Sequence, residues 1–221
     1  MKTLVFVSFL LVTLTLVSGL QCDKEFIPPP PIEQYFKEKV GLTPSQKAYN
    51  VNDTIWVSYF VPDKSLLDTV TNKRLPTNGV KFPFGIVVLP KYKTPANAAE
   101  GYCDFIVDSR LNPKYDKSQY ASVVSFDIGC DGLPGYDIRV GVVLKYSGVY
   151  LLNIPSTVIE LDSCAYQRKP YPNSILRFGY DVEDCNMDIF LNIPPVDRKE
   201  FPEDYTEKII DYKLGYVVNV L

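Results

Sequence analysis

The side chains with chemical potential in this 221-residue chain are five cysteines and 26 carboxylates, and the chain contains no histidine. Without an imidazole, the chain cannot form Ser-His-Asp or Cys-His nucleophile arrangements or histidine-ligated zinc or iron sites. It also lacks the commonest general base near neutral pH. Any enzyme activity would therefore have to use carboxylates, lysine, tyrosine or a serine-lysine pair.

Two carboxylate pairs are close enough in sequence to be candidates for glycan hydrolysis: Glu160 with Asp162, and Glu183 with Asp188. A glycosidase needs two carboxylates that face one cleft. A chain with this many acids offers such pairs by chance, so we expect no enzyme activity. A carboxylate-based glycan hydrolase is kept as the alternative function.

Acidic residues also gather around Cys185, where Asp181, Glu183, Asp184 and Asp188 lie within eight positions. Calcium takes six to eight oxygen ligands, but this spacing matches no known calcium-binding loop. We therefore predict a solvated acidic turn, and neither a metal nor another cofactor.

Residues 1–21 have the pattern of an export signal. Lys2 supplies a positive charge, Leu4 to Val17 form an apolar run, and Ser18 and Gly19 end it. The run is shorter than the twenty or so apolar residues of a spanning helix. Cleavage near Gly19 would release a soluble secreted or periplasmic protein.

A second cleavage site is indicated by Leu20-Gln21-Cys22, which resembles a relaxed bacterial lipobox with Gln21 where a small residue is usual. Lipidation of Cys22 would anchor the mature chain to a membrane. Consecutive prolines favour an extended polyproline II conformation, so Pro28 to Pro31 would act as a spacer. We predict residues 22–47 to be a lipid-anchored, proline-rich tether.

The other four cysteines are an even number, and cysteines of exported proteins usually form disulfides. Nearest neighbours in sequence suggest Cys103 with Cys130 and Cys164 with Cys185, although four cysteines allow three connectivities. If these four all pair, Cys22 is left over. This parity also favours lipidation of Cys22.

Alternating apolar residues predict about eight to ten strands between residues 48 and 221, which we expect to form a single antiparallel β-sandwich domain. The pattern is clearest over residues 137–145, which are expected to form a hairpin with residues 149–154. One short C-terminal helix is predicted over residues 201–212. The net charge of −3 and the lack of a basic cluster argue against a nucleic-acid partner.

Four other segments have specific expectations. Residues 54–61 carry apolar bulk at both sets of alternating positions, which favours a central strand covered on both faces. Residues 81–89 are expected to form an edge or bulged strand, because Pro83 and Gly85 interrupt it. Residues 65–79 are expected to form a long surface loop, and residues 187–193 a strand.

Aromatic residues make up 13% of the chain, and tyrosine dominates them. We expect most of these rings to fill the core. Tyrosine also suits recognition of proteins or glycans, because it combines an apolar face with a hydroxyl. The predicted recognition patch is Tyr166, Arg168, Lys169 and Tyr171, four side chains of one short loop.

Two stretches, Tyr49 to Val57 and Gly148 to Pro155, together with the leader, resemble uncharacterised secreted and outer-membrane lipoproteins of the Bacteroidota. The resemblance implies a location and a β fold, without an activity. We therefore predict a non-enzymatic lipoprotein of the outer membrane or cell surface. It would be a binding or envelope-structural module with a protein or glycan partner.

Overall fold

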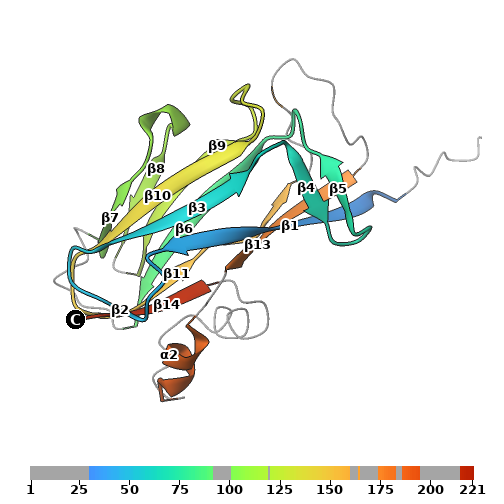
Figure 1. Ribbon diagram of the computed structural model, residues 1–221. Helices are drawn as coiled ribbons and strands as arrows, with labels where there is room; N and C mark the ends of the chain where they lie inside the picture. The colour runs from blue at the N-terminus through green and yellow to red at the C-terminus, as the bar shows by residue number, and fades with distance from the viewer. Residues whose placement is uncertain are drawn as a thin grey trace, which may run out of the picture. The chain divides into compact units, whose positions relative to one another are not determined.

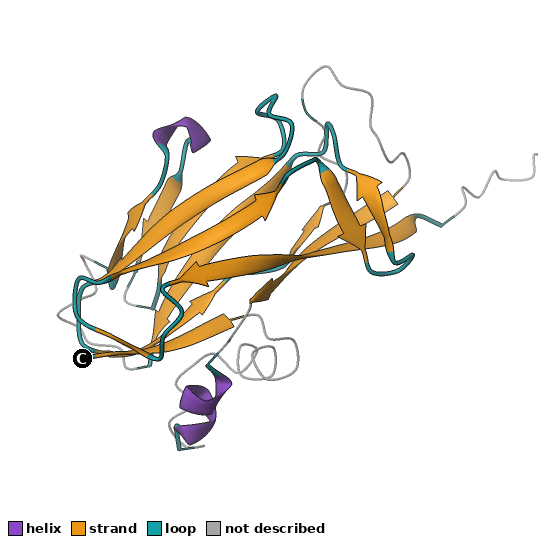
Figure 2. Ribbon diagram, viewed as in Figure 1, coloured by secondary structure: helices purple, strands orange, loops and turns teal. Residues whose placement is uncertain are grey.

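The computed structural model describes residues 30–91, 101–118, 120–159, 164, 174–182, 186–194 and 215–221. The residues from Pro31 onward form one compact unit. Its strands form two sheets packed face to face, which confirms the predicted β-sandwich (Figure 1). Strands dominate the described residues, as Figure 2 shows. None of the helices in these ranges is long and apolar enough to cross a membrane.

The first sheet has the strand order β12-β13-β1-β3-β10-β7. These strands are β12 (Thr157–Ile159), β13 (Ser174–Val182), β1 (Ile32–Thr43), β3 (Thr54–Val61), β10 (Tyr136–Leu144) and β7 (Cys103–Ile106). A hairpin of β4 (Ser65–Asp68) and β5 (Lys73–Pro76) joins the sheet where Phe36 of β1 pairs with Asp68. The ladders are antiparallel except that β1 and β13 are parallel.

The second sheet has the strand order β2-β14-β11-β6-β9-β8. These strands are β2 (Ala48–Tyr49), β14 (Gly215–Val220), β11 (Gly148–Asn153), β6 (Phe82–Pro90), β9 (Ser122–Ile128) and β8 (Lys114–Lys117). The 3-10 turn η2 (Ser109–Leu111) links β7 in the first sheet to β8 in the second. Helix α2 (Met187–Asn192) packs Phe190 into a separate small apolar cluster with residues of β6, β11 and β14.

Aromatic rings occupy the space between the sheets, as expected from the composition. Phe82 of β6 stacks on Phe178 of β13, with ring centroids 4.1 Å apart. Tyr59 contacts both Phe84 and Tyr180. Each of these rings is at least 98% buried. Burial of such large apolar surfaces is the main favourable term in folding.

The predicted tether of residues 22–47 is wrong for its second part, because Ile32–Thr43 form β1 inside the first sheet. Phe36, Val40 and Leu42 point toward the core, and Phe36 is 1% exposed. Lys37 and Lys39 fall on the other face, as in a half-buried strand. The sandwich therefore begins at Ile32 and not at residue 48.

Three further predictions of local structure are corrected. Residues 65–79, expected to be a long loop, contain the hairpin β4–β5. Residues 187–193, expected to be a strand, contain α2. Residues 137–145 and 149–154 do not form a hairpin, because β10 lies in the first sheet and β11 in the second. The predicted helix at residues 201–212 lies outside the described residues.

Pro83 and Gly85 predicted an edge or bulged strand, and β6 lies between β11 and β9 rather than at an edge. Its ladder with β11 covers only Val87 to Pro90, whereas its ladder with β9 begins at Phe82. Within the described part of the chain, Pro83 therefore has a strand on one side only. Proline in a sheet is confined to positions that need no hydrogen bond from its nitrogen, such as an edge. Pro83 occupies an edge position of this kind, although β6 as a whole is a central strand.

Candidate functional site

The outer face of β3 carries apolar side chains that the core does not cover. Ile55, Val57 and Tyr59 point inward and are at most 1% exposed. Trp56 and Phe60 alternate with them and point outward; Trp56 is half-buried and Phe60 is 66% exposed. The expectation that β3 is covered on both faces is therefore wrong.

Trp56, the sole tryptophan of the chain, lies against the neighbouring strand β10. Its cross-strand partner is Gly141, and a Cβ atom added there would be 3.1 Å from Trp56 Cζ3. The absence of a side chain at Gly141 lets the indole lean over β10. Ile106 of β7, 47% exposed, lies on the other side of Gly141 and borders the same space.

Arg139 of β10 completes this surface. Its guanidinium carbon lies 4.2 Å from the centroid of the Trp56 ring, which is a cation-π contact. Arg139 is exposed, and none of the ion pairs found among the described residues includes it. We call Trp56, Phe60, Ile106 and Arg139 the outer patch. Trp and Arg are the residue types most enriched among the energetically dominant contacts of protein interfaces.

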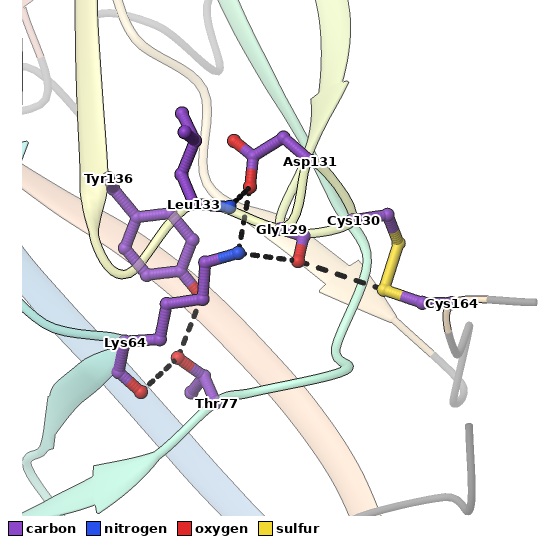
Figure 3. A network of polar contacts seen from close by, with 8 residues as sticks. All are labelled: Lys64, Thr77, Gly129, Cys130, Asp131, Leu133, Tyr136 and Cys164. Atoms are coloured by element: carbon purple, nitrogen blue, oxygen red, sulfur yellow. Dashed lines mark hydrogen bonds and ion pairs between the residues drawn. A yellow bond between two sulfur atoms is a disulfide. The ribbon is translucent and has the colours of Figure 1, made fainter.

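A second polar cluster lies around Lys64, which is 6% exposed (Figure 3). Its ammonium donates hydrogen bonds to the Gly129 carbonyl at 3.0 Å and to Asp131 Oδ1 at 2.8 Å. It also lies 5.7 Å from the centroid of the Tyr136 ring. These contacts compensate for burial of the charge, so we assign Lys64 a structural role in holding the β9–β10 turn.

Thr77 connects this cluster to the β5–β6 connection. The hydroxyls of Thr77 and Tyr136 are 2.7 Å apart, and Thr77 Oγ1 donates to the Lys64 carbonyl at 3.0 Å. A hollow of about 460 Å³ lies beside Lys64 and is bordered by Asn78, Gly79, Gly129, Cys130, Gly132, Leu133 and Cys164. The polar groups of Lys64, Thr77 and Tyr136 are hydrogen-bonded, so none of these three described side chains offers the hollow a free nucleophile.

Among the described residues, a disulfide joins Cys130 to Cys164, with Cα atoms 5.4 Å apart. The predicted pairs, Cys103 with Cys130 and Cys164 with Cys185, are therefore wrong. Cys103 is a free thiol on β7, and burial raises its pKa to about 12. Proximity in sequence misled here because β7 and the β9–β10 turn belong to different parts of the sandwich. The parity argument for lipidation of Cys22 no longer holds.

The other predicted site residues lie outside the described residues. These are the lipidation site Cys22, the fourth cysteine Cys185, and the recognition patch of Tyr166, Arg168, Lys169 and Tyr171. The structure therefore neither brings this patch together nor separates it.

The candidate carboxylates are described only in part, since Glu160, Asp162, Glu183 and Asp184 lie outside the described ranges. Asp181 lies 3.9 Å from the Lys37 ammonium, and Asp188 forms an ion pair with Lys47. The hydrogen bond from Lys47 lowers the pKa of Asp188, whereas a general acid requires a raised one. Among the described residues there is no group of three or more Cys, Asp or Glu side chains able to hold a metal ion.

The outer patch was missed from the sequence, although a signal for it existed. In residues 54–61 both sets of alternating positions carry apolar bulk, which predicts a strand covered on both faces. Such a pattern also fits a strand with one buried face and one recognition face. The small residues Ser58 and Gly141 beside the outward rings favour the second interpretation, because they leave the rings accessible.

Comparison with known proteins gives little. No protein-family model matches the chain, and no curated protein does. Among solved structures, the human F-spondin reeler domain aligns with 10% identity and a TM-score of 0.32, over 71% of this chain and 92% of that one. A type II cohesin dyad from the adaptor ScaA scaffoldin of Acetivibrio cellulolyticus aligns with 12% identity and a TM-score of 0.28. This second alignment covers 68% of the chain and 46% of the cohesin dyad. With TM-scores below 0.5, neither likeness supports a conclusion about function.

Proposed function

We propose that this protein is a non-enzymatic binding module of the cell envelope, which contacts its partner through the outer patch. The observation that carries the proposal is the exposure of Phe60 and Ile106, 66% and 47%, beside the Trp56–Arg139 stack. Isolated exposed apolar residues are ordinary, but these gather on three adjacent strands of one sheet face. Covering them with a partner would remove apolar surface from water.

The architecture supports a rigid recognition face. Trp56, Ile106 and Arg139 project from three adjacent ladder-paired strands, β3, β7 and β10, so their spacing is set by main-chain hydrogen bonds. Side chains fixed in this way lose less conformational entropy on binding than side chains of a loop. A protein or a glycan of the envelope is the partner class that we propose.

The cellular location of the protein is part of the same proposal. The leader and Leu20-Gln21-Cys22 support export with a lipid on Cys22, at the outer membrane or cell surface. The described sandwich begins at Ile32, so residues 22–31 would be the link between the lipid and the domain. Release without a lipid, as a soluble secreted or periplasmic protein, is the alternative.

The binding proposal is tested with the double variant Phe60→Ser, Ile106→Ser. Both side chains are about half-exposed or more, so the changes leave the core intact. The matched control is Val158→Ser, which alters a 53% exposed residue of β12 in the same sheet. The probes are an array of defined glycans and detergent-solubilised envelope proteins immobilised for surface plasmon resonance.

We expect the double variant to lose binding at least about tenfold, since hot-spot residues contribute 1–2 kcal/mol or more each. The control should bind like the wild type. If the double variant and the wild type bind every probe equally, the outer patch is not the recognition surface.

The anchor is tested separately by intact-mass measurement of the mature protein purified from its native membrane. A diacylglycerol and an acyl chain on Cys22 would support the lipoprotein assignment. A mature chain that begins at Leu20 with an unmodified Cys22 would replace it by the secreted alternative.

A further inference from the structure

Strand β10 has β3 along nearly its whole length on one side, and β7 along only part of its length on the other side. Its ladder with β3 extends from Tyr136 to Val143. Its ladder with β7 on the opposite side covers only Gly141 to Leu144. The first half of β10 therefore has no strand beside it on the β7 side among the described residues.

The main-chain groups that face this open side belong to Asp137 and Arg139. The Lys145 N–H donates to the Tyr102 carbonyl at 3.1 Å, on the β7 side, in continuation of the β10–β7 register. In an antiparallel ladder, alternate residues direct their N–H and C=O groups to opposite sides. The odd-numbered residues of β10 thus face the β7 side, and within the described structure no partner bonds Asp137 or Arg139 there.

The charges of these two residues make the open edge complementary to itself. When two antiparallel copies of β10 are paired about a two-fold axis through Ile138, Asp137 of each copy lies opposite Arg139 of the other. Opposite charges at directly paired positions stabilise a ladder, and like charges destabilise it. Moving the axis to residue 137 or 139 would place two aspartates or two arginines opposite each other, so this register is favoured over its neighbours.

We propose that the protein forms a symmetric dimer by pairing the open edge of β10 with the same edge of a second copy. The pairing joins the first sheets of two sandwiches into one continuous sheet, as expected for an isologous two-fold interface. It would provide main-chain hydrogen bonds for Asp137 and Arg139 of both copies, together with two symmetric ion pairs. It would also remove an unprotected sheet edge, which is otherwise an aggregation hazard.

The length of the open segment fits this arrangement. It is bounded by Gly141, where the ladder with β7 begins, and by a bend at Gly135. A Cβ atom added at Gly135 would lie 2.4 Å from the Val61 carbonyl oxygen and 2.6 Å from the Pro62 carbonyl oxygen. The chain before β10 thus packs tightly against the end of β3, which is on the side opposite β7.

The test is a charge exchange. The mature chain, produced with Cys22→Ser to prevent lipidation, is measured by sedimentation velocity over a range of concentrations. Asp137→Arg and Arg139→Asp each place like charges opposite each other, and each should weaken the dimer about tenfold or more. The double variant Asp137→Arg, Arg139→Asp restores opposite charges and should return the dissociation constant to near that of the wild type.

Asp181→Arg is the matched control, since it makes the same charge change on β13, away from the open edge. Circular dichroism verifies the fold of every variant. Amide hydrogen exchange gives a second measurement: the Asp137 and Arg139 amides should become protected as the wild-type concentration rises, and remain unprotected in the single variants.

A wild-type chain that stays monomeric with both amides unprotected overturns the proposal, leaving the edge to a strand of another protein. A dimer that the single variants leave unchanged, or that the double variant fails to restore, also overturns it. These outcomes are independent of the outer-patch test, because Phe60→Ser, Ile106→Ser changes neither charge.

Discussion

Removal of the Cys130–Cys164 disulfide should destabilise the sandwich by an amount that follows from its position. The bond joins residues separated by 34 positions, across the β9–β10 turn and the segment between β12 and β13. In the chain-entropy model, a closed loop of this size lowers the entropy of the unfolded chain enough to stabilise the fold by about 4 kcal/mol. For a domain of this size, that is a fall in melting temperature of about 10 °C.

The assay is urea unfolding of wild type and Cys130→Ser, Cys164→Ser, with and without reductant, followed by tryptophan fluorescence. Reductant should lower the stability of the wild type, and the double variant should lose most of this response. Cys103→Ala is the control and should respond to reductant as the wild type does, because Cys103 is a free thiol. A non-reducing peptide map that joins Cys130 to Cys103, or a double variant within about 1 kcal/mol of wild type, would refute the reasoning.

Three further predictions concern buried polar groups. Lys64→Met keeps the apolar stem but removes the contacts to Gly129 and Asp131, so the free energy of unfolding should fall by about 1–2 kcal/mol, measured by urea unfolding at pH 7. Asp68→Ala should cost about 3 kcal/mol, because the buried carboxylate accepts bonds from Tyr35, Val70 and Thr71. Burial alone would raise the pKa of Asp68, but these donors outweigh it and lower the pKa. The ionised Asp68 therefore stabilises the fold fully above the unfolded pKa of about 3.9, and this stabilisation is lost as pH falls through the lower folded pKa. The difference in free energy of unfolding between wild type and Asp68→Ala should shrink between pH 5 and pH 2, as measured by an acid titration of stability. Cys103 should react with iodoacetamide at neutral pH only after unfolding, as followed by mass spectrometry, because it is fully buried and its pKa is raised to about 12.

The fold class could be predicted from the sequence because alternation of apolar residues directly encodes one buried face of a strand. Residues 137–145 show this best, and they became β10 with Ile138, Val140 and Val142 in the core. Alternation does not say which strands are neighbours. The link from Lys145 to Ser147 is short enough for a hairpin, yet it crosses from one sheet to the other.

Local composition also misled where tertiary contacts decide. The proline run before the first strand suggested a tether that extended to residue 47, but Phe36 and Val40 bury enough apolar surface to hold this strand between β13 and β3. The polar stretch after Ser65 looked like a loop. Its aspartate instead organises a hairpin by accepting bonds from nearby backbone N–H groups, which no apolar period reveals. The disulfide pairing failed for the same reason, since loop closure depends on topology rather than on sequence distance.

The β9–β10 turn connects the disulfide and the buried Lys64 to the open half of β10. It is held at one end by the disulfide at Cys130 and by Lys64, which bonds to Gly129 and Asp131. Its other end, at Gly135, packs against the carbonyls of Val61 and Pro62 and leads directly into the open half of β10. A strand segment that has a neighbour on one side only would fray if it followed a mobile turn. A turn fixed by a covalent bond and a buried charge instead keeps Asp137 and Arg139 in register with β3. The same strand therefore presents Arg139 to Trp56 on its outer face and keeps its free edge ordered for a second chain.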